Sequence, residues 1–486
     1  MSGWPRRAAL VCLFLIGAAP AAVEGGYCTV VSRATLAEPA WCAVVDALTA
    51  KYGAETVTWA ESVTEARAAL AVKHPRYCGF VARPEEAGRR FVVAVHRLTR
   101  ALDDDPYGDC LWGILTGYEA ADALRMVRAE PLTVRRGLGG TAIPLDVIGE
   151  GVWFDEGRRN HMVVKPANGK AADQPGPDDP AERIVELLNT ARPDVFITSG
   201  HATERDWQIG YSYPAGSLRC RDGVLLGVPR DQLKVVPVPG SPNARRIEIA
   251  KAFAVNSPNP KVHLGVGNCL IGHLSDRQAM AAALLHSGGV NQMAGYTVVS
   301  WYGFMGWGLN DYFLGQAGRY NLAQAFFANQ QALLARLETE FPGKPRLDLE
   351  EADYAANAAT LNKVAAKLGY TKPEPALKDH LGLLWDRDTL AFYGDPAWDA
   401  RLAPQALAFD QTLTTADGKL VVELQAKQDV TLGRPPLLWW PQRLVKGGEV
   451  VAGEELRPVV TDDFVLLAGT RKLVAGRTYR VEVRPR

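Results

Sequence analysis

The chain has 486 residues, of which 47% are hydrophobic and 22% charged, and this length predicts roughly three domains of ~150 residues each. Lysine plus arginine and aspartate plus glutamate each number 54, so the formal net charge is zero. This balance gives no indication of a nucleic-acid-binding surface or a polybasic membrane anchor, and the composition is typical of a globular protein with sizeable buried cores.

The N-terminus has the pattern of an export signal. Arg6 and Arg7 precede the apolar stretch Ala8–Ala19, and Ala19-Pro20-Ala21 has the small-x-small form of a cleavage site. We therefore predict a signal peptide over residues 1–21 and an exported protein that is secreted, periplasmic or held at the cell surface. This apolar stretch is short for a bilayer span and no later segment offers ~18 unbroken apolar residues, so no integral membrane span is expected.

Residues 22–135 alternate short apolar runs with helical patterns, which predicts an N-terminal α/β subdomain with a parallel sheet covered by helices. Cys28 and Cys78 each open a predicted strand, and neighbouring strands could bring them together, although disulfide connectivity cannot be deduced from sequence. Strands are expected at residues 28–31, 57–59, 78–81 and 91–95, and helices at 41–51, 62–72 and 119–127.

Glycine- and proline-rich loops in residues 131–180 indicate a junction, so a second α/β subdomain is predicted over 136–402. In it, Ser275 and Gln278 have the spacing of a capping box before a helix at 279–286, and a strand is expected at 296–300. Residues 403–486 alternate apolar and polar side chains, and Asp417-Gly418 is a hairpin turn pattern, so this segment predicts a small β-sandwich.

An acidic loop runs from Asp103 to Asp109. Clustered carboxylates can hold calcium in an exported protein, so a structural calcium ion is possible here. The even ligand spacing of a dedicated calcium loop is missing, and a solvated turn is the alternative interpretation.

The pattern that indicates chemistry is a histidine and a cysteine at two predicted strand ends. His201 follows the run Val195–Gly200, and Cys269 follows Val262–Asn268. Open α/β sheets bind ligands at the carboxyl ends of their strands, so these side chains are expected to meet in one crevice. An imidazole beside a thiol is suited to nucleophilic acyl transfer. The chain lacks H-E-x-x-H, paired C-x-x-C and G-x-S-x-G motifs, and no metal ligand set or cofactor motif is predicted for this site.

The order of these motifs resembles the gingipain family in the caspase-like clan of cysteine peptidases. The resemblance covers most of the mature chain loosely, and it rests on Ser199-Gly200-His201 followed by Trp207, on Cys269-Leu270-Ile271-Gly272, on Gly288-Gly289, on Val298-Val299-Ser300-Trp301 and on Tyr393-Gly394-Asp395-Pro396.

The resemblance implies a caspase-like α/β fold with helices on both sheet faces, followed by an immunoglobulin-like β-sandwich. It implies a cysteine endopeptidase that acts on polypeptides through a thioester acyl-enzyme and requires no cofactor. In this interpretation Cys269 is the nucleophile and His201 the proton carrier. The backbone N–H groups of Gly200 and Cys269 form the oxyanion hole, and Trp301 lines the substrate pocket.

Several alternatives stay open at this stage. Glu150, Asp155 and Glu156 are equal candidates for a carboxylate that orients His201. Ala202 stands where the family usually has glycine, and Asn268 where a small residue is common. A catalytically inactive surface or binding protein that uses the aromatic run 301–307 is therefore the main alternative, and a hydrolase or transferase for non-peptide acyl groups is a third.

Overall fold

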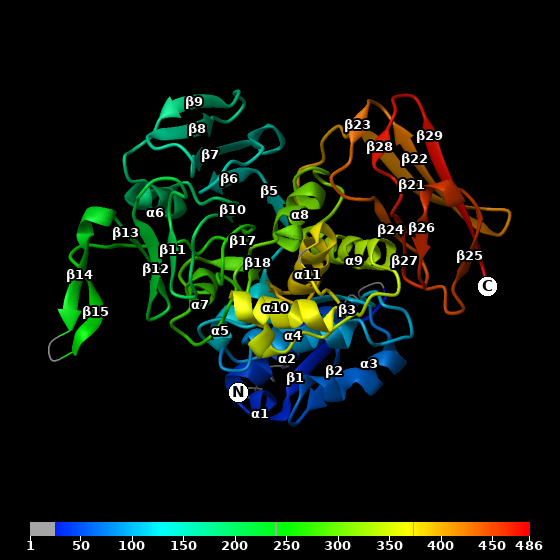
Figure 1. Ribbon diagram of the computed structural model, residues 1–486, viewed down its shortest axis with the longest axis horizontal. Coiled ribbons are helices and arrows are strands. Elements are labelled where there is room, and N and C mark those ends of the chain that lie inside the picture. The colour runs from blue at the N-terminus through cyan, green and yellow to red at the C-terminus, as the bar shows by residue number, and fades with distance from the viewer. Residues whose placement is uncertain (1–24, 239–240, 373) are drawn as a thin grey trace, which may run out of the picture.

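A computed structural model describes residues 25–238, 241–372 and 374–486 (Figure 1). The predicted signal peptide lies outside these described residues. Among the helices in the described ranges, none combines the length and the apolar character that a membrane crossing needs.

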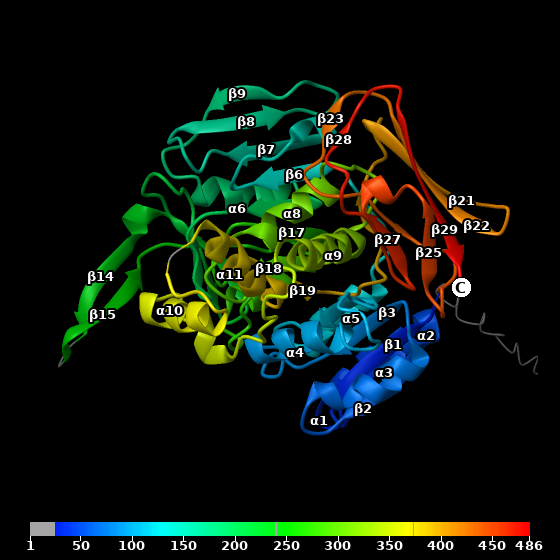
Figure 2. The ribbon, with the colours of Figure 1, turned by 45° about the vertical axis from the view of Figure 1, so that its right-hand side comes forward.

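A central twelve-stranded sheet organises the described part of the chain, with β1 to β3 at one end and β6 to β9 at the other (Figure 2). Its order is β2-β1-β3-β4-β19-β18-β17-β10-β6-β7-β8-β9. In chain order its strands span Tyr27–Ser32 (β1), Glu55–Trp59 (β2), Tyr77–Val81 (β3), Leu111–Leu115 (β4), Arg136–Gly139 (β6), Glu150–Phe154 (β7), His161–Lys165 (β8), Ala172–Pro175 (β9), Val195–Thr198 (β10), Lys261–Gly265 (β17), Val290–Tyr296 (β18) and Leu390–Tyr393 (β19).

The sheet consists of two parallel blocks that run in opposite directions. Strands β2, β1, β3, β4 and β19 form one block, and β18, β17, β10, β6 and β7 form the other. The blocks meet where β18 pairs antiparallel with β19, and β8 and β9 add an antiparallel edge. The predicted α/β class with a mostly parallel sheet is confirmed. The predicted subdomain boundaries at 135/136 and 402/403 stay predictions.

Helices cover both faces of the sheet because its strands are apolar on both sides. In β1, Val31 packs with Trp41 and Val44 of α2, whereas Val30 packs into the core that contains Leu70 of α3 and Val92 of α4. The helices span Arg33–Leu36 (α1), Pro39–Tyr52 (α2), Arg67–Lys73 (α3), Arg89–Thr99 (α4), Ala120–Arg128 (α5), Ala181–Thr190 (α6), Met280–Leu285 (α7), Phe304–Phe313 (α8), Leu322–Glu340 (α9), Ala358–Lys367 (α10) and Pro375–Arg387 (α11).

The strand predicted at residues 91–95 is wrong, because these residues lie in α4. A short apolar run does not distinguish a buried strand from a buried helix by periodicity alone. Here the helix buries Phe91, Val92, Val95 and Leu98. The polar residues at its ends allow the same run to form an amphipathic helix.

Two predictions near Cys269 are also corrected. Helix α7 starts at Met280 without a side-chain cap, because the side chain of Gln278 bonds to Asp222 instead of forming the predicted capping box. The strand predicted at 296–300 is β18, which ends at Tyr296, and the residues after it leave the sheet. Ser300 is thereby free to approach Cys269, at 3.8 Å between Oγ and Sγ.

Cys28 and Cys78 are direct neighbours in the register of β1 and β3, as expected from adjacent strands. All six cysteines of the described residues are free thiols in this structure. Burial raises the pKa of Cys28 to about 11, with a further contribution from the charge of Glu55, so this thiol is unreactive at neutral pH.

An insertion between β10 and β17 forms smaller sheets beside the main one. Strands β11 (Asp206–Gln208), β12 (Ser217–Arg221), β13 (Val224–Val228) and β16 (Phe253–Ala254) pair antiparallel. The hairpin of β14 (Leu233–Val238) and β15 (Ser241–Ile249) projects from the body at the left of Figure 1. Strand β5 (Leu132–Val134) pairs with β20 (Ala400–Leu402).

The C-terminal segment forms antiparallel sheets around a core of its own. The small β-sandwich stays a prediction. The turn at Asp417-Gly418 has both residues at positive φ, 51° and 72°, as the hairpin prediction requires. The immunoglobulin-like class stays a prediction. The strands span Phe409–Ala416 (β21), Lys419–Ala426 (β22), Val430–Thr431 (β23), Leu437–Trp439 (β24), Gly448–Ala452 (β25), Pro458–Val460 (β26), Phe464–Leu467 (β27), Lys472–Leu473 (β28) and Thr478–Pro485 (β29).

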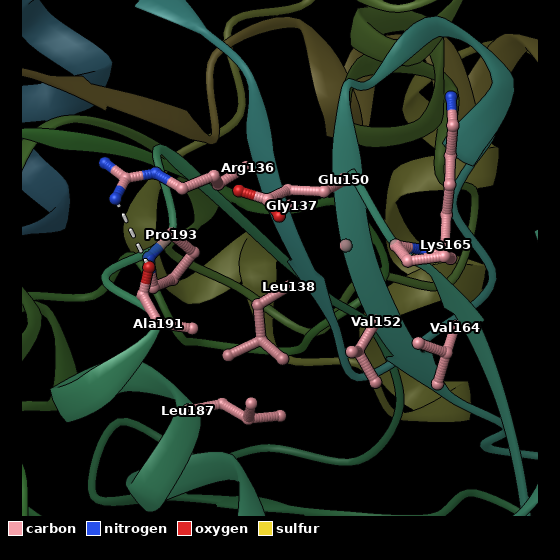
Figure 3. A pocket seen from close by; sticks show the side chains of 12 residues that line it. Arg136, Gly137, Leu138, Glu150, Val152, Val164, Lys165, Leu187, Ala191 and Pro193 are labelled. Atoms are coloured by element: carbon pink, nitrogen blue, oxygen red, sulfur yellow. Dashed lines mark hydrogen bonds between the residues drawn. The ribbon is translucent and has the colours of Figure 1, made fainter. Parts of the chain in front are cut away.

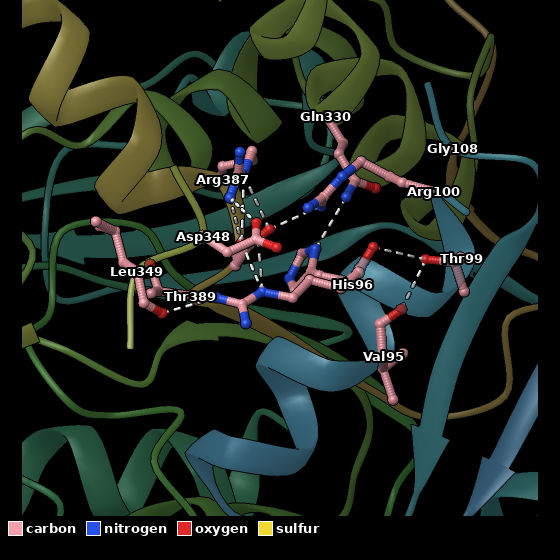
Figure 4. A network of polar contacts seen from close by, with 12 residues as sticks. Val95, His96, Thr99, Arg100, Gly108, Gln330, Asp348, Leu349, Arg387 and Thr389 are labelled. Atoms are coloured by element: carbon pink, nitrogen blue, oxygen red, sulfur yellow. Dashed lines mark hydrogen bonds and ion pairs between the residues drawn. The ribbon is translucent and has the colours of Figure 1, made fainter. Parts of the chain in front are cut away.

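A buried polar network joins α4, α9 and the link between α11 and β19 (Figure 4). Asp388 in this link is fully buried and pairs with Arg100 at 2.7 Å and Arg387 at 2.9 Å. Burial alone would raise the pKa of Asp388, but the charges of these arginines lower it well below its usual range. Nδ1 of His96 accepts from the side-chain amide of Gln330 at 2.9 Å, and burial lowers the pKa of His96 to about 4.

We predict that Asp388→Asn lowers the free energy of unfolding by about 3 kcal/mol, because two buried guanidinium groups lose their counter-charge. Asp348→Asn is the matched control: Asp348 also pairs with Arg387, but its side chain is 57% exposed, so a loss below about 1 kcal/mol is expected. A carboxyl whose pKa is lower in the folded than in the unfolded state stabilises the fold at pH values above its unfolded-state pKa. This stabilisation is lost as the pH falls through the folded-state pKa. The difference between wild type and Asp388→Asn should therefore shrink below about pH 4 in denaturant titrations.

Candidate active site

Strands β10 and β17 lie side by side, parallel and in register, with Thr198 opposite Gly265. Both strands end at the same edge of the sheet, so the segments that follow them leave from adjacent positions. These segments carry His201 and Cys269, and both residues line one cleft of about 340 Å³. His201 and Cys269 thus border the same cleft, and among the described residues no hydrogen bond joins their side chains.

A chain of buried hydrogen bonds connects the two strand ends. Asn268 donates from Nδ2 to the carbonyl oxygen of Gly200 at 3.1 Å and accepts from the hydroxyl of Thr198 at 2.5 Å. Thr198 in turn lies 3.1 Å from Nε2 of His263, and burial lowers the pKa of His263 to about 3. A neutral His263 with its proton on Nε2 therefore donates to Thr198, and the chain runs from His263 to Gly200.

The backbone next to the dyad is conformationally constrained. Gly200 has φ of +94°, a conformation that favours glycine. Leu270, directly after Cys269, also has positive φ, 57°, which is uncommon for a non-glycine residue, and its N–H donates to the carbonyl of Val298 at 3.0 Å. Within the described ranges, the N–H groups of Gly200 and Cys269 donate to no other protein group. They are available to an oxyanion.

His201 is exposed and stacks on the ring of Tyr211, with centroids 4.8 Å apart. Tyr211 and Ser212 donate their N–H groups to the carbonyl oxygen of Glu156, at 2.7 and 2.9 Å. Trp207 donates from Nε1 to the carbonyl of Ser199 at 2.7 Å and holds the strand end before His201. The histidine is thus positioned by the loop that follows it.

The three candidate carboxylates, Glu150, Asp155 and Glu156, lie in different surroundings. Glu150 begins β7 and lines a different pocket, beside Arg136 and Lys165 (Figure 3). Asp155 contacts His161 at 2.8 Å and caps the turn that follows it. Glu156 is the candidate that lines the cleft of His201 and Cys269.

One oxygen of Glu156 is available for a further partner. Oε1 accepts from the hydroxyl of Thr141 at 2.7 Å, whereas Oε2 is buried without a hydrogen-bond partner among the described residues. A Cβ atom placed on Gly200 would lie 3.6 Å from this Oε2, so the free oxygen faces the residue before His201. Burial raises the pKa of Glu156, and its hydrogen bonds partly offset this.

The opposite wall of the cleft comes from residues 300–307. Trp301 lies there, together with Tyr302 and Trp307, which is 43% exposed. The role of Trp301 in a substrate pocket stays a prediction. Asp386 in α11 holds this wall, because its Oδ2 accepts from the N–H of Met305 at 3.0 Å and from the hydroxyl of Tyr296 at 2.8 Å. The wall is therefore anchored to the helical layer.

Sequence reasoning missed some contacts in the cleft. Ser300 lies 3.8 Å from the sulfur of Cys269 and donates to the carbonyl of Gly267 at 3.1 Å, and Tyr211 covers His201. Neither residue has a sequence pattern that sets it apart, since both reach the cleft from loops whose path depends on tertiary packing. Among the described residues, sets of side chains with metal-ligand spacing lie elsewhere, at the acidic loop.

Neither a protein-family model nor a curated protein matches this chain. Solved structures with a similar chain path include one titled as a protease, at 10% identity and a TM-score of 0.36, covering 95% of both chains. Another is the Arg-specific cysteine proteinase gingipain R, at 10% identity and a TM-score of 0.37, covering 95% of this chain and 92% of that one. A complex of pro- and mature domains from Porphyromonas gingivalis has 10% identity and a TM-score of 0.33. A likeness of this strength does not establish an activity.

We predict that Asn268→Ala lowers the free energy of unfolding by about 2 kcal/mol, because the Thr198 hydroxyl and the Gly200 carbonyl lose a buried partner. Asn189→Ala is the matched control. Asn189 likewise joins two groups, here both of the backbone, at 3.0 and 2.8 Å, but from a more exposed position, so a smaller loss is expected. If both variants lose the same free energy of unfolding in urea denaturation, the hydrogen bonds of Asn268 stabilise the fold no more than those of the more exposed Asn189.

Proposed function

We propose that this chain is an exported cysteine endopeptidase in which Cys269 and His201 hydrolyse peptide bonds. The observation that supports this most directly is that both side chains line one cleft, at the ends of adjacent parallel strands. The export proposal rests on the sequence pattern of residues 1–21.

In the first step, the sulfur of Cys269 attacks the carbonyl carbon of the scissile peptide bond, and its proton passes to His201. The N–H groups of Gly200 and Cys269 stabilise the oxyanion that forms, an effect worth about 3 kcal/mol per donor in related sites. The C–N bond then breaks, and His201 gives the proton to the leaving amine. This leaves a thioester on Cys269.

In the second step, a water molecule attacks the thioester carbonyl while His201 accepts its proton. The C–S bond breaks, the carboxylic acid product leaves, and the thiol is restored. Glu156 acts as the positioning residue, because its buried Oε2 lies beside Gly200 and lacks a hydrogen-bond partner among the described residues.

The aromatic wall supports extended binding of a polypeptide. Trp301, Tyr302 and Trp307 offer large apolar faces, and Tyr211 closes the side near His201. The exposure of Trp307 also suits the alternative, a binding protein without catalysis. Labelling with a thiol probe and peptide cleavage distinguish the two functions, since a binding protein would show neither labelling of Cys269 nor cleavage.

We predict that Cys269→Ala abolishes labelling of the purified protein by an electrophilic thiol probe and lowers kcat/KM on a peptide library by about 10³-fold or more. Cys220→Ala is the matched control: Cys220 is also partly buried, and burial raises its pKa, so both readouts should stay at the wild-type level. Labelling that persists in Cys269→Ala, or cleavage unaffected by it, would overturn the proposal. Labelling with hydrolysis of esters but of no peptide would instead support an acyl hydrolase.

We predict that Glu156→Gln lowers kcat/KM by about tenfold or more, because a neutral amide replaces the carboxylate that faces the backbone before His201. Burial raises the pKa of Glu156, so its carboxylate protonates at a higher pH than an ordinary glutamate, and wild-type activity should fall as pH drops through this value. That part of the pH profile should be missing in Glu156→Gln.

Asp155→Asn is the control for this prediction, because Asp155 is the neighbouring residue but bonds to His161. Its pH profile should match the wild type. If Glu156→Gln and wild type have the same pH profile and kcat/KM, Glu156 has no part in positioning His201.

A further inference from the structure

The hydroxyl of Ser300 lies in the cleft beside the sulfur of Cys269. Oγ of Ser300 and Sγ of Cys269 are 3.8 Å apart, within hydrogen-bond reach for a sulfur atom, and both residues line the cleft. Among the described residues, this contact is the hydrogen bond that the thiol makes, whereas the ring of His201 stacks on Tyr211. The partner of the thiol in the free protein is therefore a serine of the opposite wall.

Backbone hydrogen bonds bring Ser300 to this position. The N–H of Gly272 donates to the carbonyl of Tyr296 at 2.9 Å, and the N–H of Leu270 donates to that of Val298 at 3.0 Å. These two bonds hold the residues after the cysteine beside the residues after β18. Since Ser300 lies just beyond Val298, and the cysteine directly precedes Leu270, this pairing brings the two side chains to the same part of the cleft.

The segment that ends at Ser300 is also held by α11 and the link that follows this helix. The N–H of Thr297 donates to the carbonyl of Thr389 at 2.9 Å, and Nε1 of Trp385 donates to the carbonyl of Val299 at 2.9 Å. Trp385 and Thr389 are fully buried, so these hydrogen bonds are costly to break. The backbone therefore keeps Ser300 next to the sulfur.

The single proton of the Ser300 hydroxyl is used on the other side of the serine. Oγ donates to the carbonyl oxygen of Gly267 at 3.1 Å, and a carbonyl oxygen only accepts. In the described part of the chain, no backbone N–H donates to this carbonyl, so Ser300 is its donor. Toward the sulfur, the serine oxygen offers a lone pair, and the thiol S–H is the donor in that contact.

The other ionisable groups of the cleft give a resting thiolate little support. Besides Cys269, the ionisable side chains that line the cleft are Glu156, His201, Tyr211 and Tyr302. The hydroxyl of Tyr302 bonds to Asp379 and Arg336, at 2.9 and 3.1 Å. Since the lining contains no lysine or arginine, His201 is the lining group that can supply a positive charge.

We propose that Ser300 is a positioning residue that holds the thiol of Cys269 protonated and turned toward the wall until a substrate binds. This inference rests on the function proposed above, in which Cys269 is the nucleophile. By accepting a hydrogen bond from the S–H, the serine oxygen stabilises the neutral thiol, and ionisation of the thiol breaks this bond. The thiolate is the form that reacts with electrophiles, so the contact restrains the sulfur in the free protein.

Ser300 itself neither gains nor loses a proton during the reaction. When a substrate enters, the S–H proton leaves the serine oxygen and passes to His201. The electron pair of the sulfur forms the bond to the carbonyl carbon, and the carbonyl oxygen takes up the negative charge. The contact with Ser300 forms again when hydrolysis of the thioester restores the thiol.

The test measures how fast iodoacetamide alkylates Cys269 in the full purified chain, followed by mass spectrometry of the peptide that contains this residue. Wild type is compared with Ser300→Ala, with Ser300→Thr and with the control Ser275→Ala. Ser275 is an exposed serine that follows the nucleophile in the chain, outside the lining of the cleft.

At about pH 6, Ser300→Ala should be alkylated about threefold faster than wild type, because the neutral thiol loses its acceptor. At about pH 10 thiols are largely ionised, so the rates of all variants should converge. Ser300→Thr keeps the hydroxyl and should match wild type at both pH values, as should Ser275→Ala.

Equal rates for wild type and Ser300→Ala at the lower pH would overturn the role of Ser300. So would a change of the same size at both pH values that threonine does not restore, since altered packing of the cleft gives that result. Alkylation needs no peptide substrate, so the proposed function fails separately. Wild type that shows the expected alkylation rates but cleaves no peptide would overturn the peptidase proposal and would support the contact between Ser300 and the thiol.

Discussion

The geometry of the candidate site depends on a chain of hydrogen bonds buried between β10 and β17. It starts at the neutral imidazole of His263, passes through the hydroxyl of Thr198 and ends where Asn268 donates to the carbonyl of Gly200. Each group in it lies within the core, where an unmade hydrogen bond is costly. The loop that carries Cys269 is therefore tied to the loop that carries His201. Asn268, which departs from the pattern of the gingipain family, is the residue that makes this connection.

The rest of the cleft is arranged around this fixed centre. On one side, the N–H groups of Tyr211 and Ser212 donate to the carbonyl oxygen of Glu156, so the surroundings of His201 are built as one unit. On the other side, Asp386 holds the start of α8 and with it the aromatic wall. The α8 helix packs closely on the end of β17, since a Cβ on Gly306 would lie 2.1 Å from the carbonyl oxygen of Val266, the residue after this strand. The wall and the segment that leads to Cys269 are thus in direct contact.

Buried carboxylates in this protein differ in how their charge is balanced, and this difference indicates their roles. Asp388 has two arginines within 2.9 Å and stabilises the packing of α4 on β19. Glu156 has only hydroxyl partners and no basic one among the described residues, and its Oε2 lies beside the candidate catalytic residues. Full compensation suits a structural role, whereas an incompletely compensated group can respond to a substrate, a proton or an ion.

Much of the architecture was predictable from local patterns. Apolar runs bounded by glycine predicted β1, β3, β10 and β17, and Asp417-Gly418 predicted its hairpin, because burial on both sheet faces and turns with positive φ restrict the residues that fit. The run at 91–95 was predicted wrongly, because five apolar residues fit a buried helix as well as a buried strand. The placement of His201 and Cys269 at strand ends also followed from the sequence, since this placement is a local property.

Only the tertiary structure decided what surrounds those two residues. It places Glu156, but not Glu150 or Asp155, in the lining of the cleft, and it brings Ser300 and Tyr211 there as well. It also places the acidic loop next to Asp462 and Asp463. These contacts link residues that are far apart in the chain. They depend on the paths of loops, which the periodicity of the sequence does not predict. Sequence determined which chemical groups stand at the ends of which strands, because strand formation depends on the local alternation of side chains. Their partners depend on how the strands and loops pack, which is a property of the whole fold.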